Sequence, residues 1–582
     1  MPEVEAPLSS GSGRVRARRA VRRRRWPWIT LAAVLLIVVG VGVWLGIKVL
    51  TVKSELEAAQ ASVAAVQGGG DTKQAIHSIA THAAVAAAAA NDPVWRASEA
   101  LPFAGDNLRA VRLASESLDA LSGGLGAPIL DAFGKSGDGP VLARVVPMMR
   151  LAAPRVTELS ASVSAVRNST SLVPQVRAGV DQVAQVLAVA APALELMPRM
   201  LGADAPKNYL LVAQNNAESV GLGGSAASQS LIRIDAGTIK ITAQADSGDY
   251  QGDLKVNVPI DQSALDLYHD VMLRRINASV SRPDFPTAAR VMTAMWQRDI
   301  HNDQIDGVIS IDPIALSHVL GATGPITVAS GDSATSENIV RLLLSEAYAR
   351  SADPAKSDQF FKEVATSVFN KVANGQFDPK KMLSAVQTGI NGGSILFWSA
   401  DPEIQQRVST MSVGGVLPAD NVAQTLLGVY FRDASRGSKI DYYMKSAVAA
   451  SAACSGSSTF TATVTLHLDL TQQAADALPA YVKSQVWGSK KFSTEVFIYG
   501  PPGTTVSNVK LGADTAKLRS SELVDLGRPV ASFTTFQRPG QSVTVTATFT
   551  AAAGAFGPLK VQTTPMVQAT KVTLAGQPCA GK

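Results

Sequence analysis

The chain has 582 residues, of which 46% are hydrophobic and 17% charged, so it is too long for a single core and predicts several domains. Its formal net charge of +6 comes entirely from the first 25 residues, where the eight arginines between Arg14 and Arg25 face only Glu3 and Glu5. The remaining chain is electrically balanced. It therefore lacks the basic footprint of a nucleic-acid-binding surface, and we expect no nucleic-acid partner.

An apolar segment without charges follows this basic tail. Residues 26–47 lie between Arg25 and Lys48, and as a helix they would cover about 33 Å, against about 30 Å for a hydrocarbon core. A cleaved signal peptide is the alternative, but its apolar core is usually about 7–15 residues and precedes a small-residue cleavage site. We therefore predict an uncleaved single-pass anchor. The positive-inside rule then places residues 1–25 in the cytoplasm and 49–582 outside.

The two cysteines of the chain, Cys454 and Cys579, both lie on the predicted outer side. An oxidising compartment allows them to pair, so we predict a disulfide, with two unrelated buried thiols as the alternative. The six histidines show no ligand spacing with the cysteines, and no metal site is predicted.

The residue patterns predict a multidomain protein that changes character along the chain. Residues 48–200 are rich in Ala, Val and Leu with helical periodicity, which indicates an alanine-rich helical stalk or bundle after the transmembrane helix. Strand and helix patterns mix in residues 205–440, which predicts a central α/β domain. Strictly alternating segments with Gly/Pro turns fill residues 441–582, which predicts a C-terminal antiparallel β-sandwich of immunoglobulin-like type.

Several elements of the α/β region are predicted individually. A buried strand is expected at 209–213, a hairpin around 230–245, and further strands at 306–311 and 394–400. Asp-Pro also occurs four times before a helical pattern, where aspartate caps the helix and proline occupies its first position. We interpret these aspartates as caps rather than catalytic acids: Asp312, Asp353, Asp378 and Asp401.

Catalytic motifs are absent from the sequence. It contains no nucleophile elbow, no phosphate-binding loop, no H-E-x-x-H and no dinucleotide fingerprint. We therefore predict no catalytic residue and no cofactor. Polar clusters in the α/β region nevertheless supply candidate ligand-binding residues: Gln214, Asn215, Asn216, Glu218, Gly223, Gly224, Asp284, Asp306 and Arg350. For the amides and glycines the alternative is structural, because Asn and Gly also terminate strands and shape turns.

Four motifs occur in order along residues 195–450: KNYLLVAQNNAE followed by paired glycines, RPDFPTAA, DGVISIDPIALSHVLGATGPI and ILFWSADPEIQQ. Together they resemble a bacterial membrane-anchored family known as domain of unknown function 4012, and the β-rich tail extends the resemblance to the end of the chain. The family usually has an arginine, a threonine and an aromatic residue around the paired glycines. This chain has Val220, Leu222 and Ser225 there, so an anion contact by that arginine would be missing.

The resemblance implies a membrane-anchored envelope protein without an established activity. Our first hypothesis is a non-enzymatic factor that binds cell-wall polysaccharide, peptidoglycan or envelope proteins. The anchor, the 306–325 segment and the AYAR segment also resemble, more weakly, the LytR–CpsA–Psr ligases. That resemblance implies the alternative of a transferase acting on a polyprenyl-phosphate-linked glycopolymer, with Arg350 on the phosphates and Asp284 on a metal.

Overall fold

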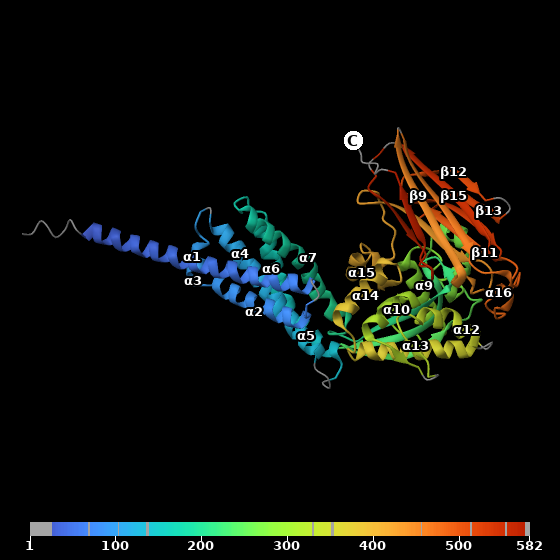
Figure 1. Ribbon diagram of the computed structural model, residues 1–582, viewed down its shortest axis with the longest axis horizontal. Coiled ribbons are helices and arrows are strands. Elements are labelled where there is room, and N and C mark those ends of the chain that lie inside the picture. Colours follow the sequence, from blue (N-terminus) through green and yellow to red (C-terminus); the bar gives the residue numbers. More distant parts are fainter. Residues whose placement is uncertain are drawn as a thin grey trace, which may run out of the picture. The chain divides into compact units, whose positions relative to one another are not determined.

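The computed structural model describes residues 26–67, 70–102, 104–134, 139–328, 331–350, 354–455, 457–512, 515–552, 554 and 556–576. The chain divides into two compact units, one comprising residues 1–136 and 148–195 and the other residues 137–147 and 196–582. The first unit is helical, and the second contains the strands (Figure 1). The predicted order of N-terminal helices followed by large sheet regions is therefore confirmed.

Alanine packs the helical unit tightly. Ala83, Ala86 and Ala90 are fully buried, and Ala86 and Ala90 share a core with Val52 and Trp95, which are each 1% exposed. Small side chains allow helix backbones to approach closely, which explains the alanine-rich composition. The unit contains α1 (Trp26–Gln67), α2 (Thr72–Ala90), α3 (Pro93–Ser98), α4 (Gly105–Leu121), a π-helical turn η1 (Ser122–Gly126) and α5 (Ala127–Gly134); α6 (Val141–Arg167) and α7 (Pro174–Met200) contribute residues to both units.

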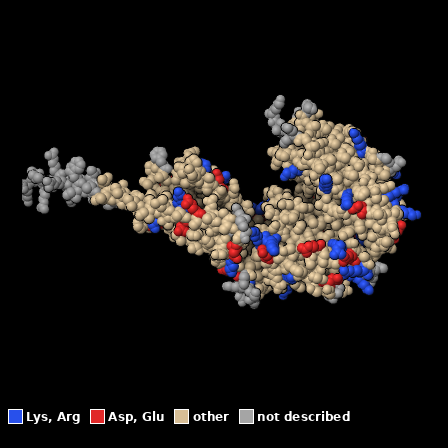
Figure 2. All heavy atoms as spheres, viewed as in Figure 1, with Lys and Arg blue, Asp and Glu red and all other residues tan. Residues whose placement is uncertain are grey.

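The first part of α1 exposes its apolar side chains. Leu35 is 65% exposed and Leu36 72%, and Figure 2 shows no charged side chain on the start of this helix. From Trp44 and Lys48 onward, α1 makes polar contacts with the rest of the helical unit. Lys48 pairs with Asp92 (3.5 Å), and Asp92 also accepts a hydrogen bond from Trp44 Nε1 (3.1 Å). Within the described residues, two helices are long and apolar enough to cross a membrane, Val34–Ala65 and the partly buried Pro174–Met200. The N-terminal helix fits either a membrane anchor or a signal sequence.

The central feature of the second unit is a mixed sheet, in which the described residues form ten strands. Its main order is β13-β14-β11-β8-β1-β2-β3; β4 pairs with β1 in parallel and with β7, and β16 pairs with β8. The strands are β1 (Lys207–Val220), β2 (Gly223–Asp235), β3 (Thr238–Asp246), β4 (Gly307–Ile311), β7 (Ile395–Ser399), β8 (Thr425–Asp433), β11 (Phe492–Tyr499), β13 (Ala516–Asp525), β14 (Arg528–Gln537) and β16 (Leu559–Thr563). Because β8 pairs with β11, the sheet joins strands on both sides of residue 440.

A second sheet packs against the C-terminal half of the first. Its described strands run in the order β12-β15-β10-β9-β17, and a shared core includes Phe431, Phe460, Ile498, Phe533 and Phe549. These strands are drawn in orange and red in Figure 1. They are β9 (Met444–Ser455), β10 (Ser457–Leu468), β12 (Thr505–Leu511), β15 (Ser542–Ala552) and β17 (Lys571–Ala575); β5 (Ile326–Thr327) and β6 (Ser333–Ala334) form a small separate sheet.

Helices cover the other strands and bury a second core. Tyr268, Phe285 and Trp296 are fully buried in it, beside Leu210 of β1 and Val308 of β4. The helices are α8 (Gln262–Tyr268), α9 (Phe285–Asp299), α10 (Pro313–Thr323), α11 (Ile339–Arg341), α12 (Ala347–Arg350), α13 (Pro354–Ala373), α14 (Pro379–Asn391), α15 (Pro402–Val408) and α16 (Gln472–Ala477), with short turns η2 (Ser247–Asp249), η3 (Asp270–Leu273), η4 (Ile276–Ala278), η5 (Leu342–Glu346), η6 (Ser412–Gly414) and η7 (Ile440–Tyr443).

Three of the four predicted aspartate caps are confirmed. Asp312, Asp378 and Asp401 precede α10, α14 and α15, and each side chain accepts a hydrogen bond from a backbone amide in the first turn. Asp353 lies outside the described residues. The predicted disulfide stays a prediction for the same reason: Cys454 lies on β9, whereas Cys579 is outside the described part of the chain. Strand β17, which ends shortly before Cys579, pairs with β9.

Candidate functional site

Strand β1 does not end where the polar residues begin. The sequence predicts a strand over 209–213, whereas β1 continues through the amides to Val220. Its pairing with β2 shifts twice, and the register jumps from Asn215↔Ser225 to Ser219↔Gly224, so residues 216–218 form a bulge. A bulge leaves residues outside the ladder and turns their side chains. The polar cluster after Ala213 is therefore an irregularity inside a long strand.

Side-chain amides hold this bulge together. Gln214 Oε1 accepts a hydrogen bond from Gly224 N (3.0 Å), and Asn215 Oδ1 accepts one from Ala217 N (3.0 Å). A Cβ at Gly223 would overlap the Gln214 side chain, and a Cβ at Gly224 would overlap the Asn215 carbonyl. Both glycines therefore allow a close approach of backbone and amide.

The remaining amide contacts reach neighbouring helices. Asn215 Nδ2 donates to the Tyr348 hydroxyl (2.8 Å), and Asn216 Nδ2 donates to Asp312 Oδ2 (2.9 Å), the carboxylate that caps α10. The three amides are at most 6% exposed. Buried amides in these contacts organise the bulge and dock it against α10 and α12.

Three other predicted site residues lie apart from the bulge. Asp284 precedes α9 and accepts a hydrogen bond from Thr287 Oγ1. Asp306 pairs with Lys207 (3.0 Å) and accepts a hydrogen bond from Asn208 N. Arg350 pairs with acids on its own surface, Asp332 (2.5 Å) and Glu346 (3.0 Å). The structure does not bring these residues together with Asn216 and Glu218 in one site.

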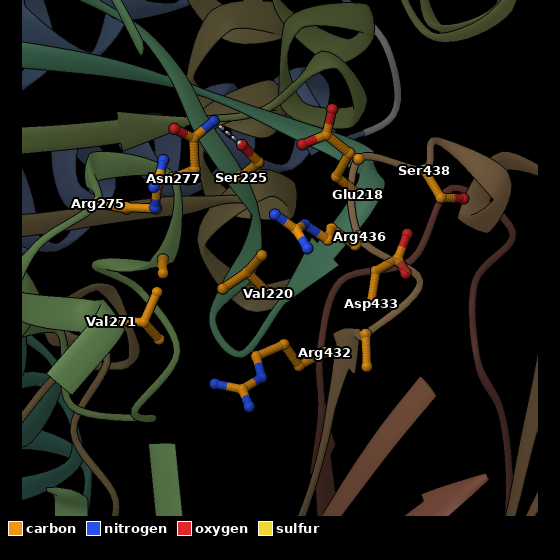
Figure 3. Close-up of a pocket in the computed structure, with 13 residues that line it drawn as sticks. Glu218, Val220, Ser225, Val271, Arg275, Asn277, Arg432, Asp433, Arg436 and Ser438 are labelled. Carbon is orange, nitrogen blue, oxygen red and sulfur yellow. Dashed lines mark hydrogen bonds between the residues drawn. The ribbon is translucent and has the colours of Figure 1, made fainter. Parts of the chain in front are cut away.

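An open cleft of about 420 Å³ lies where β1 meets β8. Among the described residues these two strands pair only at Val220↔Arg432, so they diverge on either side of that contact. Glu218 is the predicted site residue that lines this cleft (Figure 3). Its lining comes from β1, the start of β2, the η3–η4 region and the loop after β8: Glu218, Val220, Ser225, Val271, Arg275, Asn277, Ala278, Arg432, Asp433, Ala434, Arg436, Gly437 and Ser438.

Three arginines enter the cleft from different elements. Arg432 is held by Glu495 (Nε to Oε2, 2.6 Å), and Arg275 lies 3.8 Å from Asp253 and is 61% exposed. Arg436 extends toward Val220 and Ser225 in Figure 3, and no hydrogen bond or ion pair of its side chain is present in the described part of the chain. The cleft thus offers a guanidinium that is not neutralised locally.

Carboxyl groups border the arginines. Glu218 forms an ion pair with Lys439. Because Lys439 is taken by Glu218, the more deeply placed Asp433 and Asp441 have no ion-pair partner among the described residues. Burial raises the pKa of Asp441 to about 6, and the nearby Glu218 charge adds to this effect. Burial and the neighbouring Asp441 charge raise the pKa of Asp433 well above its usual range. The acid pair therefore keeps its protons to a higher pH than ordinary carboxyl groups do.

This raised pKa predicts a pH dependence of stability. The folded protein retains the Asp441 proton up to about pH 6, whereas the unfolded chain loses it near pH 3.8. The stabilisation is complete below pH 3.8 and disappears as the pH rises through 6. Relative to Asp441→Asn, the wild type should lose about 2 kcal/mol of unfolding free energy between pH 4 and pH 7. Urea unfolding of both proteins measures this difference, and parallel pH curves would contradict it.

Neither a metal nor a cofactor is indicated by the donor set. Within the described residues, no three His, Cys, Asp or Glu side chains are placed to hold a metal ion. What the cleft offers instead is cationic donors beside amide, hydroxyl and carboxyl groups. Such a set binds an anion and the hydroxyl groups next to it.

The segment that builds one wall of the cleft matches a known protein family. Residues 204–348 match the family described as "Protein of unknown function (DUF4012)". The resemblance to this family is thereby confirmed over residues 204–348, whereas the motif ILFWSADPEIQQ and the β-rich tail lie beyond the matched segment. The DUF4012 segment supplies Glu218, Val220, Ser225, Arg275 and Asn277 to the cleft, whereas the loop with Arg436 follows it in the sequence.

Comparisons with curated proteins and with solved structures do not identify a further relative. No curated protein matches the chain. Among solved structures, the transcriptional regulator yvhJ from Bacillus subtilis is 15% identical, with 35% of this chain and 76% of that chain covered and a TM-score of 0.22. The Lin1025 protein from Listeria innocua is 16% identical, with 37% and 80% covered and a TM-score of 0.22. Similarity at this level supports no assignment beyond the DUF4012 match.

Proposed function

We propose that this chain is a single-pass membrane protein whose domains lie outside the cytoplasm, where they bind an anionic polymer of the cell envelope without chemical turnover. The observation that carries the proposal is the cleft at the β1–β8 junction. Arg436 offers it a guanidinium without a local acid partner, and Arg275 and Arg432 add positive charge. Guanidinium groups bind carboxylate and phosphate oxygens through two parallel hydrogen bonds.

The neighbouring groups favour a polyhydroxylated ligand. Asn277 donates a hydrogen bond to Ser225 Oγ (2.8 Å) at the edge of the cleft (Figure 3). Amide, hydroxyl and carboxyl groups exchange hydrogen bonds with sugar hydroxyls. Because the cleft is open rather than enclosed, it suits an internal unit of a polymer. The predicted α/β domain (205–440) and β-sandwich (441–582) together form the ligand-binding part of the chain in this proposal.

Binding should depend on the charge of the polymer. We would mix the full-length protein, in a neutral detergent, with isolated cell-wall polymers in native form and after removal of phosphate or reduction of carboxyl groups. The native polymer should bind, and the neutralised polymer should lose most of its affinity. Raising the salt concentration should weaken binding as well. Equal binding of native and neutralised polymers, or binding of neither, would overturn the proposed function.

The orientation in the membrane needs a separate test. The exposed apolar start of α1 and the arginine-rich tail support a cytoplasmic N-terminus. Protease added to spheroplasts should remove the bulk of the chain and spare the tail, and in inside-out vesicles the pattern should reverse. A soluble, N-terminally shortened product in cells would support a cleaved signal sequence instead of an anchor.

A second candidate is the LytR–CpsA–Psr-like transferase acting on a polyprenyl-phosphate-linked donor. Arg350 and Asp284, the residues predicted for it, lie outside the cleft. What favours it is the combination of the cleft arginines with acids of raised pKa, Asp433 and Asp441. The test is to incubate the protein with a lipid-linked donor and to measure released polyprenyl phosphate. Release by the wild type that is lost in Arg436→Gln would establish the transferase in place of the binding function.

A further inference from the structure

We propose that the cleft binds an oxyanion of the phosphate or carboxylate class together with a proton, with Arg436 as the anchor of the anion and the Asp433–Asp441 pair as the holder of the proton. The inference rests on the proposed function, because it concerns the same cleft. It adds the ligand chemistry, the residues responsible and a dependence on pH.

Arg436 is held ready for an anion by its loop. It adopts a left-handed backbone conformation (φ 50°), which non-glycine residues rarely occupy and which the surrounding structure must enforce. Its carbonyl accepts a hydrogen bond from Gln485 N (3.1 Å), and Ser435 O accepts one from Ser484 Oγ (2.8 Å). The loop is thus fixed on both sides, while the guanidinium itself is left for the cleft.

The two aspartates are incompletely satisfied when ionised. Asp433 Oδ1 accepts a hydrogen bond from Ser435 N (2.6 Å), and Asp441 Oδ2 accepts hydrogen bonds from Ser219 N (2.9 Å) and Ser219 Oγ. The second oxygens, Asp433 Oδ2 and Asp441 Oδ1, are buried without a partner among the described residues. Burying an ionised carboxylate with one oxygen that accepts no hydrogen bond costs free energy. Protonation neutralises the charge and removes most of this cost.

The charges around Asp433 leave its ionisation uncompensated. Glu218 on β1 and Asp441 on η7 are acidic, and the Lys439 charge is taken by Glu218. Arg432 is occupied by Glu495, and Arg436 and Arg275 face the cleft. An anion on Arg436 would therefore be repelled by an ionised Asp433. Protonation of the pair removes this repulsion, so that the anion and the proton favour each other.

This coupling fixes the sign of the pH effect. Burial raises the pKa of both acids, to about 6 for Asp441. Below that pH the pair is neutral and the anion binds tightly. As the pH rises through 6, affinity should fall, by about tenfold between pH 5 and pH 7.5. By the same linkage, the bound anion makes the pair retain its proton to higher pH.

The test uses the full-length protein in a neutral detergent and two small probes whose charge stays constant between pH 5 and pH 7.5. Dimethyl phosphate represents the phosphodiester source and glucuronate the carboxylate source. Ligand-observed NMR titrations at both pH values give the affinities. We expect at least one probe to bind about tenfold more tightly at pH 5, and the tighter probe identifies the class of anion.

Variants separate the anchor from the proton holder. Arg436→Gln should abolish binding at both pH values. Asp433→Asn, which mimics the protonated acid beside the cleft, should bind more tightly than the wild type at pH 7.5 and show a smaller pH dependence. Arg350→Gln is the matched control, because this arginine lies outside the cleft, and it should behave as the wild type. If Asp433→Asn does not fold, Asp441→Asn provides the same comparison.

The outcomes distinguish this inference from the function on which it rests. Wild-type binding that does not change with pH, or an Asp433→Asn protein that keeps the full pH dependence, would overturn the proton coupling. In either case binding of the native envelope polymer would leave the proposed function standing. Binding of neither probe at either pH would overturn the oxyanion site itself.

Discussion

Replacing Asp525 with alanine is expected to destabilise the sheet-containing unit by about 3–5 kcal/mol. Asp525 is 1% exposed and Arg282 is 3% exposed, and they are joined by two hydrogen bonds of 2.6 and 3.1 Å. The same carboxylate accepts hydrogen bonds from Tyr499 and Ser263 (2.9 Å each). Without Asp525, the Arg282 charge and the buried Tyr499 hydroxyl lose their principal partner. Arg282 then keeps only the largely exposed Asp261 (2.5 Å) as a close acid, so the cost comes from the weakened compensation of a buried charge rather than from the value of the ion pair itself.

Urea unfolding followed by tryptophan fluorescence measures this loss. Asp270→Ala removes an exposed ion pair with Arg274 in the same unit and should change stability by less than about 1 kcal/mol. The double replacement Arg282→Met with Asp525→Leu removes both buried charges, leaves only the largely exposed Asp261 without its cation, and should recover much of the loss. If the Asp525→Ala protein is as stable as the Asp270→Ala protein, the buried network around Asp525 does not stabilise the fold as argued.

Gly224→Ala is expected to cost about 3 kcal/mol or more and to disturb the bulge of β1. The added Cβ would overlap the carbonyl of Asn215, which is backbone and has no rotamer to which it can move. Relief requires the hairpin to open, and that breaks the hydrogen bond from Gly224 N to Gln214. Glycine at this position therefore has a steric reason, independent of any ligand.

Gly321→Ala is the matched control for this substitution. Gly321 lies inside α10, it is exposed, and a Cβ there meets nothing within 4 Å. Because glycine is a poor helix former, this replacement should stabilise the protein by about 0.5–1 kcal/mol. Thermal unfolding of the two variants should therefore shift in opposite directions. Equal shifts would contradict the steric argument for Gly224.

Local patterns in the sequence predict much of the local structure. Alternation predicts strands within residues 441–582, where β10, β11, β14 and β15 lie, and the Asp-Pro pairs mark the starts of α10, α14 and α15. The hairpin between β2 and β3 turns at Ala236 and Gly237, both with positive φ, within the predicted segment. These features are predictable because strand alternation, capping and turn conformations depend on neighbouring residues.

The cleft depends on contacts that local patterns do not contain. Val220 meets Arg432 although more than 200 positions separate them in the chain, and Arg436 lies on a loop without a recognisable motif. The strand β1 is also interrupted by polar residues, so that its alternation ends at Ala213 while the strand itself continues. Buried amides replace the missing ladder contacts, and periodicity does not reveal such a replacement.

The net charge of the chain gives no indication of the cleft arginines. The chain after the basic tail has no net charge, and Figure 2 shows acidic and basic side chains interspersed over the visible face. The sequence places Val220 where the family usually has an arginine, which predicts a lost anion contact. Val220 does line the cleft, but Arg275, Arg432 and Arg436 bring positive charge to it from other elements. A run such as FRDASRGSK, with two arginines after a buried strand, is the signal that points to this loop.

The most direct test of the central claim compares the wild type, Arg436→Gln and Arg350→Gln in binding the native envelope polymer. Both variants lose one positive charge, but only Arg436 lines the cleft, whereas Arg350 pairs with Asp332 and Glu346. We expect Arg436→Gln to bind at least about tenfold more weakly and Arg350→Gln to bind as the wild type does. Equal affinity of all three proteins, or a loss confined to Arg350→Gln, would contradict the assignment of the cleft as the anion-binding site.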